Sequence, residues 1–146
     1  MYRRAARLEV LLVHPGGPFF GKKDLGAWTI PKGLPEPSEP LLAAAIREFR
    51  EETGLAARAP YLELGSIRQK GGKLVHGWAF EGELPHGFVL ASNSFELEWP
   101  PRSGQRRAFP EIDRAEFFEL ARAHEKINQA QRAFLDRLTQ ALSTQP

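Results

Sequence analysis

The pattern of apolar and polar residues along the chain predicts strands separated by turns rich in glycine and proline. Residues 7–14 (RLEVLLVH) are rich in Leu and Val and stop at Pro15, so we expect a buried strand that runs into a loop. Residues 61–68 and 73–83 alternate in part around a Gly-containing turn at 69–72. This arrangement is typical of a β-hairpin.

Other stretches complete the predicted set of elements. Residues 27–30 are expected to form a short strand, and residues 95–99 (FELEW) and 114–120 (RAEFFEL) have the composition of strands. Near the C-terminus a helix is predicted over residues 127–142. Its apolar positions recur at helical spacing and are Ile127, Ala130, Phe134, Leu138 and Leu142. We therefore expect an α/β fold with helices on both sides of a sheet.

A second helix is predicted over residues 40–53, in the middle of the chain. Ser38 is suited to its N-cap, Pro40 to its first turn and Gly54 to the position just past its last turn. Residues 31–37, before the helix, hold three prolines and a glycine and must form a shaped loop. The apolar stripe expected to bury the helix against the sheet is Leu42, Ala45, Ile46 and Phe49.

Three glutamates of this helix share one flank. At about 100° per residue, Glu51 and Glu52 lie roughly 60° to one side and 40° to the other of Glu48. Carboxylates that converge repel one another unless a cation lies among them, and such oxygen ligands select Mg²⁺ or Mn²⁺. The alternative is a solvated face on which these acids pair with Arg47 and Arg50.

Composition limits the class of protein. A chain of 146 residues with 42% hydrophobic content fits one compact domain spanning residues 1–146. Because the chain has no cysteine and no long apolar run, we expect a soluble cytoplasmic protein without disulfides or a membrane span. The net charge of +2 suits an anionic substrate but is too small to indicate a stable nucleic-acid partner.

The helix and the loop before it resemble the signature of the Nudix hydrolases. Gly33 is followed after five residues by Glu39, and after seven more by the run REFREETGL at 47–55, which ends on Gly54 and Leu55. The resemblance implies a Nudix-type α/β/α sandwich with a mixed sheet, and cleavage of a pyrophosphate in a nucleoside diphosphate linked to another group. It also implies that Mg²⁺ or Mn²⁺ is the cofactor.

Carried over to this sequence, the resemblance makes Glu48, Glu51 and Glu52 metal ligands or bases. It makes Glu39 and Arg47 partners that hold the loop and the helix in register, with Gly33 and Gly54 as structural positions of the box. The form Trp-x-x-Pro-Lys-Gly at residues 28–33 is similar to that of Nudix enzymes acting on diadenosine polyphosphates, RNA caps and inositol pyrophosphates.

Residues beside the box are candidates for metal and substrate contacts. The carbonyl of Lys32 is a candidate metal ligand and its ammonium a candidate phosphate contact, the alternative being an exposed loop lysine. Phe19 and Phe20, in the loop 16–26 with Lys22 and Lys23, either stack on a base or cover the edge of the core.

Residues after the box supply further candidates. Glu96 and Glu98 alternate onto one face of the strand at 95–99, where we expect a metal ligand (Glu96) or a base (Glu98), unless both are plain surface acids. Arg68, Lys70 and Lys73 cluster around the hairpin turn. Arg102 lies in an expected loop that also holds Arg106 and Arg107, and these basic residues either contact phosphates or are solvated.

Outside the box, the segments RQKGGK at 68–73 and EWPPRSG at 98–104 are similar to those of a bacterial Nudix subgroup described as predicted nucleoside triphosphate pyrophosphohydrolases. Nudix domains usually carry a strand before residues 7–14, whereas only residues 1–6 are available here. The pairing of that edge stays open, with a neighbouring segment or a second copy in a homodimer as ways to complete it.

These observations predict Mg²⁺-dependent hydrolysis of a small-molecule nucleotide, either a nucleoside triphosphate or a dinucleoside polyphosphate. The alternative is a catalytically silent Nudix-fold module that binds or senses a nucleotide. Degenerate sensors usually lose box acids, and the box acids here are all present.

Overall fold

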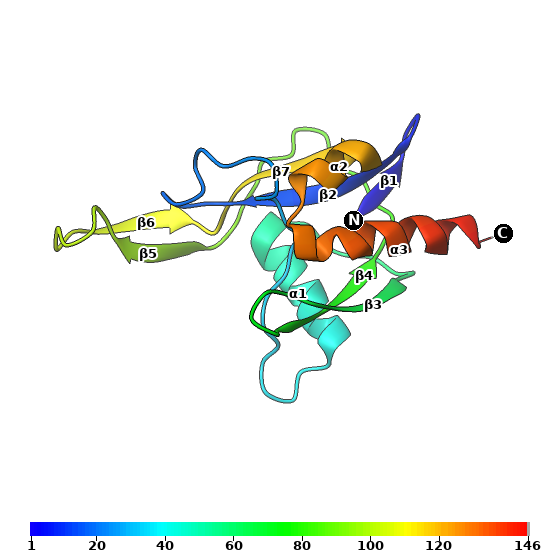
Figure 1. Ribbon diagram of the computed structural model, residues 1–146, viewed down its shortest axis with the longest axis horizontal. Helices are drawn as coiled ribbons and strands as arrows, with labels where there is room; N and C mark the ends of the chain where they lie inside the picture. The colour runs from blue at the N-terminus through cyan, green and yellow to red at the C-terminus, as the bar shows by residue number, and fades with distance from the viewer. Residues whose placement is uncertain (146) are drawn as a thin grey trace.

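The computed structural model describes residues 1–145 (Figure 1). A helix of the predicted central segment, α1, is preceded by two strands and followed by two hairpins, a long strand and two further helices. The elements are β1 (Tyr2–Arg4), β2 (Leu8–Pro15), α1 (Leu41–Thr53), β3 (Leu62–Arg68), β4 (Leu74–Ala79), β5 (Ser94–Glu98), β6 (Arg106–Pro110), β7 (Ile112–Glu119), α2 (Leu120–Lys126), the 3₁₀ turn η1 (Gln129–Gln131) and α3 (Arg132–Ser143).

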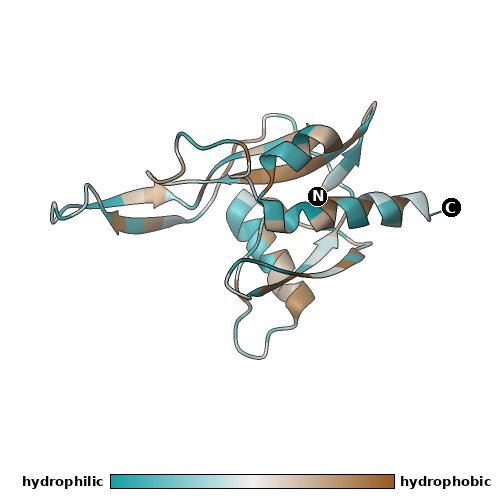
Figure 2. Ribbon diagram, in the orientation of Figure 1, coloured by the Kyte–Doolittle hydropathy of each residue, from teal (hydrophilic) through white to brown (hydrophobic). Residues whose placement is uncertain are grey.

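The central sheet is antiparallel, in the order β1-β2-β7, with β2 in the middle. Strand β2 carries a run of apolar residues over 10–13, brown in Figure 2, and this run is buried because both faces of the sheet are covered. The N–H of Tyr2 donates to the carbonyl of Phe80 at 3.0 Å, and a parallel bridge joins Tyr2 to Glu81. Strand β1 therefore connects the β3–β4 hairpin to the central sheet, and the pairing is mixed.

Helices cover the two faces of this arrangement. Alternation along β2 sends Val10 and Leu12 into a core shared with Phe134 of α3, and sends Leu11 into a smaller cluster with Phe49 of α1. Gly77 of β4 meets the α3 side so closely that a Cβ there would lie 2.7 Å from the Phe134 ring. The expected α/β/α arrangement is confirmed.

The N-terminal edge is completed by the chain itself. Residues 2–4 form β1 and pair with β2 in the register Tyr2↔Val10 and Arg4↔Leu8. A short turn at Ala5–Arg7 reverses the chain, with the N–H of Ala5 donating to the carbonyl of Arg7. Six residues are thus enough for the strand that usually precedes this sheet.

The start of α1 differs from the prediction. The helix begins at Leu41 with Pro40 as the N-cap, and no side chain caps it. Ser38 takes a left-handed conformation, with φ of 65°, because the turn between Glu36 and Glu39 closes just before the helix. The prediction of Ser38 as the N-cap is therefore wrong, while Gly54 ends the helix with φ of 80°, as predicted.

The helix predicted over residues 127–142 starts later than expected, and a separate helix that was not predicted precedes it. Residues 120–126 form α2, Ile127 ends it, and α3 begins only at Arg132. The side chain of Asn128 accepts from the N–H of Ala130 at 2.9 Å, which starts a separate turn. A seven-residue helix is too short for its period to stand out from the strand before it. No helix within residues 1–145 has the length and apolar character needed to cross a bilayer.

Strands β5 and β6 form a hairpin that extends away from α1 (Figure 1). The prediction that Arg106 and Arg107 lie in a loop is wrong, because both lie on β6 and pair with β5. The hairpin is supported by the loop after β2, where Phe19 meets Trp99 edge-on at 5.5 Å. Residues 27–30, expected as a strand, make only isolated bridges from Trp28 and Thr29.

Candidate active site

The C-terminal end of α1 is held firmly, which fixes the positions of its glutamates. The N–H of Gly54 donates to the carbonyl of Arg50 at 2.7 Å, closing the last turn. Thr53 is fully buried, and its hydroxyl donates to the carbonyl of Phe49 at 2.6 Å. Because Phe49 is anchored in the core, Glu51 and Glu52 are presented from a rigid turn.

Arg47 connects the proline-rich loop to the helix. Its Nε and Nη2 donate to the two carboxylate oxygens of Glu39 at 3.0 and 2.9 Å, and Nη2 also donates to the carbonyl of Leu34 at 3.0 Å. Its Nη1 donates to Glu48 at 2.9 Å and to Glu51 at 3.2 Å. The predicted Arg47–Glu39 pairing is present, and it lowers the pKa of Glu39 to about 2.

Gly33 gives Glu48 the space that it occupies. A Cβ at Gly33 would lie only 2.0 Å from the carboxyl carbon of Glu48, so any side chain there would displace that carboxylate. Glycine at this position is therefore required by a close approach. The loop and the helix meet at the point where Glu48 is held by Arg47.

Glu52 has a different environment. Its carboxylate accepts from the N–H of Lys32 at 3.2 Å. Burial raises the pKa of Glu52 to about 7, the negative charges of Glu48 and Glu111 add to this rise, and the N–H and charge of Lys32 partly oppose it. Glu111, in the link between β6 and β7, is thus an acid near the site that the strand pattern did not single out.

The acids fit a hard divalent cation by chemistry. The candidate donors are all oxygens, namely carboxylates and the backbone carbonyl of Lys32. Burial and neighbouring acids raise the pKa of Glu52, and a bound cation would stabilise its ionised form. In the arrangement that residues 1–145 adopt, no three Asp, Glu, His or Cys side chains converge on one point. Glu48 and Glu51 bond to Arg47, whereas Glu52 bonds to Lys32.

The acids predicted on the strand at 95–99 lie elsewhere. Glu96 pairs with Arg106 across the hairpin at 3.3 Å, and Glu98 lies opposite Arg106 in the register, where both are exposed. Figure 1 shows this hairpin directed away from α1. Alternation correctly put both acids on one face, but the tertiary arrangement brings Glu111 rather than either of them into the field of Glu52.

The basic and aromatic candidates are dispersed. Phe20 lies beside Lys23, 5.3 Å from its ammonium, and Arg102 lies in the turn at the end of the extended hairpin. Arg68 donates to the carbonyl of Gly72 in its own turn, and Lys70 lines a separate open cavity with Leu25 and Asn128. Within residues 1–145, none of these four side chains forms a hydrogen bond or ion pair with the box.

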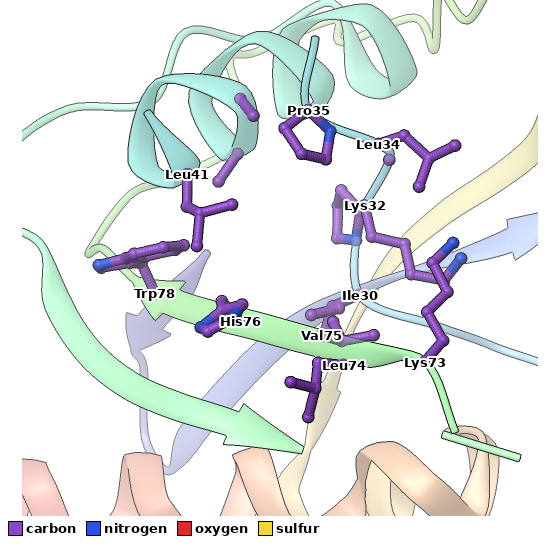
Figure 3. A pocket seen from close by; sticks show the side chains of 14 residues that line it. Ile30, Lys32, Leu34, Pro35, Leu41, Lys73, Leu74, Val75, His76 and Trp78 are labelled. Atoms are coloured by element: carbon purple, nitrogen blue, oxygen red, sulfur yellow. The ribbon is translucent and has the colours of Figure 1, made fainter. Parts of the chain in front are cut away.

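A cavity of about 100 Å³ adjoins the box between α1 and β4 (Figure 3). Lys32 and Lys73 extend toward the same end of it, while His76 and Trp78 line the β4 side. His76 and Trp78 are two residues apart on β4, and the period-2 alternation of a strand places such residues on one face. They were not singled out from the sequence.

The apolar stripe of α1 is also corrected. Ala44 and Phe49 are buried, whereas Leu42, Ala45 and Ile46 are only half-buried. These three line a second cavity of about 80 Å³, which shares Trp78 and His76 with the first. The N-terminal half of α1 therefore packs loosely against the sheet, and only its C-terminal half packs tightly.

The raised pKa of Glu52 predicts that the free energy of unfolding of the chelator-treated protein depends on pH. The folded-state pKa is raised from 4.5 to about 7, so the carboxyl ionises less readily in the folded chain than in the unfolded chain. Stability therefore falls as pH rises through this window, and the group contributes nothing below it, where both states are protonated. We expect Glu52→Gln to raise the unfolding temperature by several degrees at about pH 8 and to change it little at about pH 4.

Thermal unfolding followed by circular dichroism at the two pH values measures this difference. Glu63→Gln, at an exposed position of β3, is the matched control and should change neither temperature. A Glu52→Gln protein less stable than the parent at pH 8 would contradict burial as the main influence on Glu52.

Two known proteins are similar in sequence to parts of this chain. The chain is 43% identical over 75 residues to the mRNA-decapping protein g5R of African swine fever virus (isolate Pig/Kenya/KEN-50/1950), covering 50% of this chain and 28% of that protein. It is 32% identical over 100 residues to the RNA pyrophosphohydrolase of Erythrobacter litoralis (strain HTCC2594), covering 60% of each. The chain thus spans less than two thirds of the length of either relative.

A solved structure and a family model extend the similarity to the fold. The crystal structure of a C. elegans Ap4A hydrolase binary complex superposes with a TM-score of 0.68 at 22% identity, covering 97% of this chain and 93% of that one. The NUDIX domain model matches residues 1–138. Because that match takes in α1 with its glutamates and the strands that hold them, the chain belongs to the Nudix family.

Proposed function

We propose that this protein is a Mg²⁺-dependent hydrolase of pyrophosphate linkages in nucleotides. The observation that carries the proposal is the arrangement around α1, where Arg47 ties Glu48 and Glu51 to the Gly33 loop while Glu52 and Glu111 leave negative charge uncompensated. The names of the relatives, an RNA pyrophosphohydrolase, an mRNA-decapping protein and an Ap4A hydrolase, support the same reaction class.

In this proposal Glu48, Glu51 and Glu52 hold the metal, joined by Glu111 from outside the box. Mg²⁺ bound there would polarise a phosphoryl oxygen and lower the pKa of water. The backbone of Lys32 orients Glu52 through its N–H, and the Arg47 guanidinium orients Glu48 and Glu51.

The substrate we propose is a nucleoside triphosphate or a dinucleoside polyphosphate. Lys32 and Lys73 line one cavity beside the box and offer two ammonium groups to a phosphate chain. The other basic residues of the loops are spread over the hairpin turns and the extended β5–β6 hairpin. The charge that selects phosphate therefore lies at one end of the cavity.

Glu52→Gln is expected to lower kcat by orders of magnitude while the fold stays intact, because the amide loses the charge needed to bind metal or accept a proton. Phosphate and pyrophosphate release from a nucleotide panel, with and without Mg²⁺, measures this loss. Glu63→Gln is again the control. Unchanged turnover in a folded Glu52→Gln protein would refute the assignment, and no turnover by the parent protein would favour a nucleotide-binding module.

Arg47→Ala is expected to reduce both activity and stability. The substitution leaves the half-buried carboxylates of Glu39 and Glu48 without their cation and frees the proline-rich loop from the helix. We expect kcat/KM to fall at least tenfold and the unfolding temperature to fall by several degrees. Arg50→Ala, at an exposed position on the same helix, is the matched control. An Arg47→Ala protein that melts and hydrolyses like its parent would show that the pairing has no role.

Longer phosphate chains are expected to be preferred over ADP-ribose, with kcat/KM falling as salt screens the lysines. Assays of a dinucleoside tetraphosphate, a nucleoside triphosphate and ADP-ribose at about 50 and 300 mM salt test this. Lys73→Gln should reduce the preference, and Arg107→Gln on β6 should not. A higher kcat/KM for ADP-ribose, or no salt dependence, would refute the proposed selection by charge.

A further inference from the structure

The cavity between α1 and β4 contains a flat aromatic surface that the metal site does not require. The rings of His76 and Trp78 are stacked, with centroids 6.5 Å apart and planes inclined by 28°. Figure 3 shows Trp78 beneath Leu41 at one end of the cavity, with His76 between it and the lysines. His76 is exposed and Trp78 is half-buried, so both rings are accessible from the cavity.

Large apolar side chains surround the same cavity. Leu34, Leu41 and Leu74 line it and are 64%, 42% and 51% exposed. A single exposed leucine needs no explanation, but three around one cavity with a stacked aromatic pair form a surface that a flat apolar ligand would cover. The other exposed large apolar side chains of residues 1–145 are Phe19, Phe20, Leu25 and Val89, and none of them lines this cavity.

The opposite end of the cavity is positively charged. Lys32 and Lys73 extend to that end, and neither has an acidic partner within 4.0 Å among residues 1–145. Two ammonium groups that share a cavity repel each other, and a phosphate between them would relieve the repulsion. Lys32 directly precedes Gly33, which touches the carboxyl of Glu48. The charged end thus leads to the box.

We propose that this cleft is the subsite for the base of the nucleotide substrate. The base stacks on Trp78 and His76, and its phosphate chain runs between Lys32 and Lys73 toward Glu48. Stacking on a ring face tolerates every base, so the subsite selects for the presence of a base more than for its identity. The inference rests on the proposed function, and it transfers the stacking role considered for Phe20 to β4.

Binding without turnover tests the subsite, so the measurements use Glu52→Gln protein at fixed Mg²⁺. Calorimetry gives Kd for ATP and for tripolyphosphate, which has the charge but no base. We expect Trp78→Leu, which keeps an apolar side chain but removes the ring, to weaken ATP binding about tenfold or more. Tripolyphosphate binding should change less than about twofold, since its contacts are ionic.

Trp99→Leu on the extended hairpin is the matched control and should change neither Kd. His76→Ala provides a second variant at an exposed position, where folding is not at risk, and should weaken ATP binding selectively. Unchanged ATP binding in the Trp78 and His76 variants, or an equal loss for both ligands, would overturn the proposal. Its failure differs from failure of the proposed function, which would show as absent hydrolysis by the parent protein.

Discussion

The guanidinium of Arg47 is the connection on which the candidate site depends. A loop with three prolines has few backbone hydrogen bonds of its own, and Arg47 binds it through Glu39 and the carbonyl of Leu34. The same group binds Glu48 and Glu51 on the helix. One side chain therefore sets the distance between loop and helix and the directions of two carboxylates.

Because Arg47 reaches only some of the acids, the carboxylates of the site have different electrostatic environments. Glu39 lies against Arg47 and has its pKa lowered to about 2, so it stays ionised. Glu52 lies on the other side of the flank, where burial outweighs the contribution of Lys32 and raises its pKa to about 7. Acids of one motif thus have opposite pKa shifts because only some of them reach the guanidinium.

The packing of α1 creates the cavity beside this charge. Phe49 and Thr53 hold the C-terminal half of the helix in the core, while Leu42, Ala45 and Ile46 stay half-buried above β4. Small residues at positions 44 and 45 leave room for the rings of Trp78 and His76. The glutamates of the box and the apolar cavity therefore share one helix and the single loop that Gly33 brings against it.

The sequence by itself determined the features that local spacing encodes, which are the helix predicted over residues 40–53 and found at 41–53, its end at Gly54 and the β3–β4 hairpin. The resemblance to the Nudix signature added the Arg47–Glu39 pair, whose partners are only eight residues apart. Tertiary structure alone decided which distant residues meet. The charge of Glu111 acts on Glu52, Trp78 lines the cavity with Leu41, and the β5–β6 hairpin extends away from α1 with Glu96. Alternation gives the face of a strand but not its position, because position follows from long-range pairing and packing.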